Sequence, residues 1–181
     1  MNRTTLSKQT HFHYYAFADF IASLSDDAFL YAPVAKWSAG QQLEHLIRSI
    51  SPLILALRLP KWVLILLFGK PNRPGRSYVQ LVGKYTSKLH AGGRASGRYI
   101  PREIHLRQKE RLIKVLKQKT DLLTRVLHRF SEKELDELLL PHPLLGKLTL
   151  REMMYFTIYH VQHHLELTQK YLGEKQNKEA Y

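Results

Sequence analysis

Apolar residues recur every three to four positions along most of the chain, which is the pattern of amphipathic α-helices. This periodicity predicts four long helices, over residues 6–24, from 38 onward, over 102–130 and over 149–172. Long alternating runs and Asn-Gly or Asp-Gly turns, which would indicate β-hairpins, do not occur in the sequence. The pattern therefore predicts an all-α fold.

Three predicted helix starts carry a capping box. In this motif a Ser or Thr side chain accepts a hydrogen bond from the backbone N–H three residues later, and the Gln or Glu side chain at that later position accepts one from the backbone N–H of the Ser or Thr. The pairs are Ser38 with Gln41, Ser131 with Glu134, and Thr149 with Glu152. The second box starts a short helix that ends before Pro141, and Gly173 is expected to stop the last long helix. Pro52 either kinks or ends the second helix, and Pro60 marks a further break.

The connection between the second and third long helices, residues 60–101, is long and irregular. Gly, Pro and Arg are frequent near both of its ends, and the pattern over 78–89 predicts a short helix between them. Charged residues and prolines interrupt the apolar segment 53–68, so a buried helical hairpin is favoured over peripheral membrane contact. With 181 residues and 44% hydrophobic content, we expect one domain over 1–175 and a polar tail over 176–181.

The net charge is +13, and its excess lies in the middle of the chain. Residues 58–119 contain sixteen Lys and Arg but two acids, whereas the remainder has twelve basic and thirteen acidic residues. Such a region attracts phosphates, anionic lipids or acidic ligands, although a solvated helix face and a polar connection are the favoured explanation. The alternative is a phosphate-binding module with stacking tyrosines, made of Arg73, Arg76, Arg94, Arg98, Arg102, Tyr78, Tyr85 and Tyr99.

Cysteine is absent from the sequence, which excludes disulfides, thiolate metal ligands and a cysteine nucleophile, and fits a reducing compartment. The N-terminal residues lack an apolar stretch followed by a small-residue cleavage site. The longest apolar run, 62–68, is far shorter than the ~20 residues of a membrane-spanning helix. We therefore expect a cytoplasmic protein without a membrane span.

Two histidines share the inward-facing row of the last predicted helix. His160 and His164 lie ~40° apart around the helix and ~6 Å apart along its axis, so both can reach one metal ion. Two buried imidazoles one turn apart need a partner, and a metal ion is a common one. His163 also neighbours His160, but it shares a face with Tyr159, Glu166 and Lys170 and is predicted to face solvent.

A third ligand has to come from another helix, and His45 is the best candidate. His11 and His13 in the first helix are weaker candidates, and four further histidines are expected in loops or on charged faces: His90, His105, His128 and His142. Glu44 is a candidate base but is more simply a surface residue. The aromatic residues Trp37, Tyr155 and Tyr159 are candidates for a pocket wall, although core packing is the more common role of such residues.

Two segments of the chain resemble the DinB-like family. They are WSAGQQLEHLI over 37–47 and LLGKLTLREMMYFTIYHVQHHLELTQKYL over 144–172. The resemblance implies a four-helix bundle, often dimeric, with a divalent metal at one end of the core. It places the three metal ligands at His45, His160 and His164, with Zn or Ni as the first candidates and Fe, Mn or Co as further ones.

The resemblance also implies a function, a metal-dependent enzyme of thiol-transferase-like or hydrolase-like chemistry. Three neutral histidines leave open positions for water or for the thiol of a small cofactor, beside which a small-molecule substrate would react. The resemblance further implies a homodimer. A scaffold that keeps the three histidines without turnover fits the same pattern, and the alternative is a non-catalytic module that uses region 58–119 to bind an anionic partner such as nucleic acid.

Overall fold

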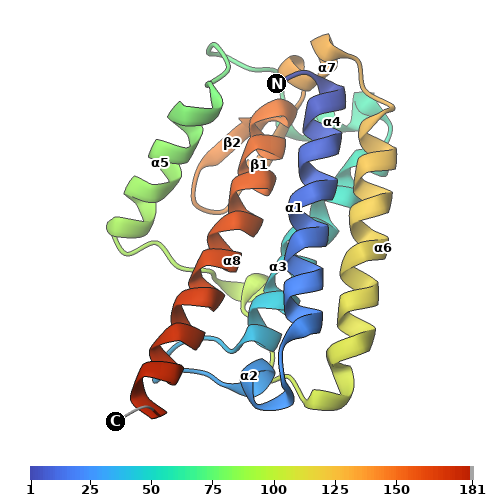
Figure 1. Ribbon diagram of the computed structural model, residues 1–181. Coiled ribbons are helices and arrows are strands. Elements are labelled where there is room, and N and C mark those ends of the chain that lie inside the picture. The colour runs from blue at the N-terminus through green and yellow to red at the C-terminus, as the bar shows by residue number, and fades with distance from the viewer. Residues whose placement is uncertain (180–181) are drawn as a thin grey trace.

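The computed structural model describes the backbone of residues 1–179 and the side chains of residues 1–175. Four long helices run side by side in Figure 1 and form a bundle. They are α1 Arg3–Ser23, α3 Ala39–Arg58, α6 Lys109–Leu127 and α8 Leu150–Glu179. Helices α6 and α8 each pack against both α1 and α3. The predicted all-α fold, a four-helix bundle with a long connection between its second and third helices, is therefore confirmed.

Shorter elements complete the described part of the chain: α2 Asp26–Leu30, α4 Lys61–Phe68, α5 Tyr78–His90, the 3-10 helices η1 Gly97–Tyr99 and η2 Leu106–Gln108, α7 Glu132–Glu137, and the strands β1 Leu139–His142 and β2 Gly146–Thr149. Helix α5 lies beside α8 (Figure 1), within the long connection. The predicted helix over 78–89 is thus confirmed. The apolar stripes of the long helices meet in one core, because each buries its residues at helical spacing.

The three predicted capping boxes are all present. Ser38 and Ser131 each accept from the third backbone N–H of their helix, and the side chain of the third residue bonds back. Thr149 and Glu152 make the same reciprocal pair at 2.9 and 3.2 Å. Helix α3 continues through Pro52 and ends at Arg58, with Leu59 as its C-cap just before Pro60. These boundaries follow from local hydrogen bonding, which is why the sequence predicts them well.

Helix α4 turns away from α3 by 113° after Pro60. Its inner face is buried through Leu64, whereas Trp62 and Leu66 on its outer face are 67% and 75% exposed. The prediction of a buried hairpin is therefore wrong for this outer face. Over the described residues, no single helix combines the length and apolarity needed to cross a membrane; α3 and α4 meet that test only when joined as a bent pair.

Two predicted helix ends are wrong. Helix α6 begins at Lys109, not at 102, because the preceding residues form an extended segment and the short helix η2. In this segment Ile104 is buried and the backbone N–H of Arg102 donates to Glu44. Helix α8 continues through Gly173 to Glu179, into the predicted polar tail; residues 180 and 181 of that tail lie outside the described residues.

A small antiparallel hairpin precedes α8, where only a short helix that ends before Pro141 was predicted. Strand β1 pairs with β2 in a register that places Leu140 opposite Leu148 and His142 opposite Gly146. Gly146 has φ = 77°, a value that favours glycine. The hairpin escapes a periodicity analysis because each strand has four residues and β1 contains Pro141.

The long connection is tied to the bundle by a buried carboxylate. Glu152 is fully buried in the first turn of α8, and the Arg73 guanidinium donates to both of its oxygens at 2.7 Å. The backbone N–H of Arg76 donates to the same carboxylate at 2.8 Å. Burial alone would raise the pKa of Glu152, but the hydrogen bonds from Arg73, Arg76 and Thr149 lower it.

Replacing Glu152 by Gln is expected to lower the free energy of unfolding by about 3 kcal/mol at pH 7, because two guanidinium groups lose a buried partner. A carboxyl group with a lowered folded-state pKa stabilises the protein fully above its unfolded pKa, and that contribution is lost as the pH falls through the folded pKa. Urea unfolding should therefore show that the difference in free energy of unfolding between Glu152→Gln and wild type becomes smaller below about pH 4. Glu137→Gln, at an exposed pair with Lys133, should change stability by less than about 0.5 kcal/mol.

Candidate metal centre

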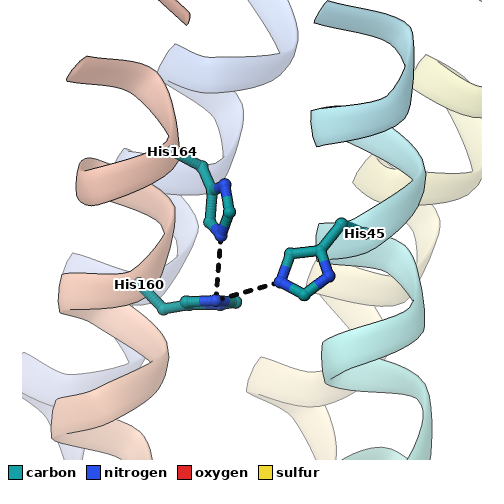
Figure 2. Close-up of side chains that lie close together, drawn as sticks. All are labelled: His45, His160 and His164. Atoms are coloured by element: carbon teal, nitrogen blue, oxygen red, sulfur yellow. Dashed lines mark hydrogen bonds between the residues drawn. The ribbon is translucent and has the colours of Figure 1, made fainter. Parts of the chain in front are cut away.

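Three histidines meet in the core between α3 and α8. His160 and His164 lie one turn apart on α8, and His45 faces them from α3 (Figure 2). The Nε2 atom of His160 lies 3.2 Å from Nε2 of His45 and 3.0 Å from Nε2 of His164. All three side chains are buried, and their ligand atoms lie within 4.8 Å of one another. The structure therefore brings together the three residues that the sequence singled out.

In His45 and His164 the ring nitrogen that faces away from the cluster, Nδ1, has a defined hydrogen-bond partner. His45 Nδ1 lies 2.7 Å from the carbonyl oxygen of Tyr99, and His164 Nδ1 is hydrogen-bonded to the Gln42 side-chain oxygen. Because both oxygens only accept, the neutral rings must donate from Nδ1, and each Nε2 then presents a lone pair. Both lone pairs point toward His160 Nε2, which can supply one proton at most. A cation between the three nitrogens would satisfy all of them at once.

The buried position also keeps the three rings in the form that binds metal. Burial lowers the pKa of His45, an effect that the Tyr99 carbonyl opposes. Burial lowers the pKa values of His160 and His164 much further, and the neighbouring histidines add to the effect. Neutral imidazoles are therefore present at pH 7, and neutral imidazole is the ligand form for Zn, Ni, Fe, Cu and Co.

A pocket of about 630 Å³ opens onto the three histidines. Ser49, Trp37 and Phe156 line it near the three histidine rings, with the Trp37 ring centroid 4.9 Å from that of His45. A tetrahedral ion held by three protein ligands keeps one position open. Here that position would face the pocket, so a water molecule or a small ligand could reach the ion.

A sequence profile of the DinB superfamily matches residues 9–168. The chain belongs to the DinB superfamily. No match was found among curated proteins or among solved structures. The matched range covers α3 and α6 completely and most of α1 and α8, and it includes His45, His160 and His164.

Several other predicted site residues lie elsewhere in this DinB fold. Trp37 lines the pocket, which is the less favoured of its two predicted roles. Tyr155 is buried in the core and Tyr159 is half-buried beside α5, and neither lines the pocket. Glu44 accepts hydrogen bonds from Arg48 and from the Arg102 backbone, and it does not line the pocket either. It is therefore a structural residue that holds the end of the long connection.

Two histidines are placed differently from the prediction. His163 does not face open solvent: it is half-buried, and its ring stacks on Tyr159 and packs edge-on against Tyr85. His142 is buried in β1, packs on Phe156 and lines the pocket, although a loop or a charged face was expected. Among the weaker candidates for a third ligand, His11 is exposed near Asp121 and is not part of the three-histidine group.

The proposed phosphate-binding residues do not act together. Arg73 and Arg76 bind Glu152, and Tyr85 is buried. Arg94 and Arg98 instead line the pocket mouth. The alternative of a nucleic-acid module therefore loses three of its eight residues to contacts within the protein.

Gln42 and Tyr99 are not predicted as site residues, although both form hydrogen bonds with rings of the three-histidine group. Gln42 lies three residues before His45 in α3, and that spacing on one helix face is a signal that could have identified it. Tyr99 acts through its backbone carbonyl from η1. No side-chain pattern encodes such a contact, so the sequence offers no comparable signal for it.

Metal content should separate the two neighbouring histidines of α8. His164→Ala removes an Nε2 lone pair from the cluster, so we expect the variant to lose most of its bound metal. Inductively coupled plasma mass spectrometry of protein purified without a His-tag measures the metal content. His163→Ala removes a ring outside the cluster and is expected to retain wild-type content. Equal losses from both substitutions would show that the wrong face of α8 has been chosen.

Gln42→Leu tests the partner of His164 separately from the ligands. The substitution leaves three imidazoles in place but removes the acceptor that fixes the His164 tautomer. We expect zinc affinity to fall about 10- to 100-fold in competition with a chromogenic chelator. Gln41→Leu alters the neighbouring residue, which caps α3 instead, and is expected to leave zinc affinity unchanged. Equal affinities for wild type and Gln42→Leu would mean that Gln42 has no part in orienting the ring.

Proposed function

We propose that this DinB protein binds a divalent metal ion through His45, His160 and His164 and uses it in an enzymatic reaction. The observation that carries the proposal is the convergence of three buried Nε2 atoms at the wall of a pocket. A structural site would be closed by a fourth protein ligand, whereas three ligands beside a pocket are typical of catalytic sites. Zn and Ni are the first candidates, because imidazole suits both.

The chain's own residues would hold and orient the reaction centre. His45 and His164 are fixed by Tyr99 and Gln42, which keeps their Nε2 atoms aimed at one point. Trp37 packs against His45 and Phe156 stacks on His160, and both would limit access of water to these rings. When bound, the metal would act as a Lewis acid that lowers the pKa of a water or thiol at the open position.

We favour thiol-transferase-like over hydrolase-like chemistry. Zinc hydrolases pair the metal with a carboxylate base, but the described residues that line this pocket include no Asp or Glu. A metal-bound thiol loses its proton without such a base, because its pKa is already much closer to neutrality than that of water. A small thiol as cosubstrate and a small electrophile as substrate fit a pocket of this size. The lack of cysteine in the sequence supports a cytoplasmic location, and we retain the homodimer as a proposal.

Metal binding is expected to stabilise the protein against heat. With free zinc at about 100 times its dissociation constant, the gain should be about 2.7 kcal/mol. Thermal unfolding of protein purified without a His-tag, with and without a chelator, measures it. Less than about a tenth of an equivalent of bound metal, together with no change in stability on chelation, would contradict the proposal.

Cobalt substitution can distinguish the two chemistries. Titration of the Co(II) protein with a small alkyl thiol should produce a sulfur-to-cobalt charge-transfer absorption band if a thiolate occupies the open position. The matching alcohol serves as the control and should produce no such band. If no thiol changes the absorption spectrum of the Co(II) protein, the result would favour bound water and hydrolytic chemistry.

A further inference from the structure

The pocket beside the three histidines has an unusual balance of charge. Its described lining includes the exposed cations Lys36, Arg94 and Arg98 but no carboxylate. None of these cations forms an ion pair with an acid of the described chain: Arg94 donates to the carbonyl of Gly93, and Arg98 lies over the Tyr99 ring. The field at the mouth is therefore positive and open to an incoming anion.

The inner part of the pocket is apolar. Leu53, Ile50 and Leu140 are at most 7% exposed in this wall, and Leu144 and Phe156 pack beside them. Burying a ligand's hydrocarbon against such residues contributes about 25 cal/mol per Å². The pocket thus combines a wall suited to an apolar body with a cationic mouth.

His142 adds one polar group inside this apolar wall. The backbone N–H groups of Leu144 and Leu145 both donate to His142 Nδ1, at 3.2 and 3.1 Å. Nδ1 is therefore an acceptor, and the proton of the neutral ring must lie on Nε2. Burial, assisted by the positive charge of Lys84, lowers the pKa of His142 to about 4, so the ring stays neutral at pH 7.

His142 lies close enough to the histidine cluster to serve the same ligand. Its ring centroid is 4.2 Å from that of Phe156, and the Phe156 ring centroid in turn lies 4.7 Å from that of His160. One aromatic ring thus separates His142 from the proposed metal ligands. No side chain of the described residues accepts from His142 Nε2, which leaves this N–H for a ligand in the pocket.

We propose that the pocket binds an organic acid with an apolar body. Arg94 and Arg98 attract the anionic group of this acid, and one oxygen of that group accepts a hydrogen bond from His142 Nε2. This inference rests on the proposed function for the identity of the pocket as a substrate site. The recognition itself depends only on residues of this chain that do not bind metal. His142 is thus a substrate-positioning residue.

Three probes with the same eight-carbon body can test the ligand class: octanoate, octanol and octylammonium. Isothermal titration calorimetry would measure their binding to zinc-loaded and to metal-free protein. We expect octanoate to bind at least about tenfold more tightly than octanol in both forms, a difference of about 1.4 kcal/mol. Octylammonium should bind most weakly, because the cations of the mouth repel it.

Two variants test the proposed contacts. The double substitution Arg94→Gln and Arg98→Gln should weaken octanoate about tenfold and leave octanol unchanged. His142→Asn keeps an acceptor for the Leu144 and Leu145 N–H groups but shortens the side chain, so it should weaken octanoate about fivefold without loss of fold. Arg107→Gln, at an exposed site outside the pocket, is the control and should match wild type.

The failures of the two proposals are distinguishable. Equal affinity for octanoate and octanol, or no binding of either, would overturn the organic-acid proposal even if zinc binds to the three histidines. A preference for octanoate that is confined to zinc-loaded protein and insensitive to Arg94, Arg98 and His142 would also overturn it, because the metal alone would then select the anion. Absence of zinc binding would overturn the proposed function. The preference of metal-free protein for octanoate over octanol would still decide whether the pocket binds an organic acid.

Discussion

The structure depends on the burial of three imidazole rings whose nitrogens face one another. Their side chains occupy core positions of α3 and α8 that would otherwise carry apolar residues. Unpaired polar atoms in a core are costly, so the surroundings of the rings have to satisfy their remaining nitrogens. Tyr99 and Gln42 do this for two of the three, and His160 Nδ1 has no hydrogen-bond partner among the described residues. The point at which α3 and α8 meet is thus fixed by polar contacts within an apolar bundle.

The long connection between α3 and α6 gives this bundle its pocket. Its helix α5 packs on α8, and Lys84 of that helix donates to the Leu145 carbonyl of the β-hairpin loop. Its short helix η1 supplies both the Tyr99 carbonyl and the Arg98 guanidinium. A segment that composition describes only as basic and irregular therefore lines part of the pocket and orients the ring of His45.

The sequence predicts what is encoded locally. Helical periodicity identifies the four long helices, and capping boxes identify the starts of α3 and α8. The spacing of His160 and His164 identifies two of the three candidate metal ligands. His45 followed from the family resemblance, because no local pattern connects it with α8. The early part of the predicted third helix failed because its charged residues fit a helix or an extended segment equally well. The burial of His142 and His163 could not be predicted, since it depends on a hairpin and a helix packed against α8 from the connection.

Glu152 combines two tasks that are usually separate. It completes the hydrogen bonding of the first turn of α8, and it binds the arginines that hold the connection against the bundle. Thr149, Glu152 and Arg73 therefore form a single energetic unit in which the effects of separate substitutions do not add. A change at the start of the histidine-bearing helix therefore alters the attachment of the arginine segment as well, and a substitution in that segment alters the start of the helix in turn.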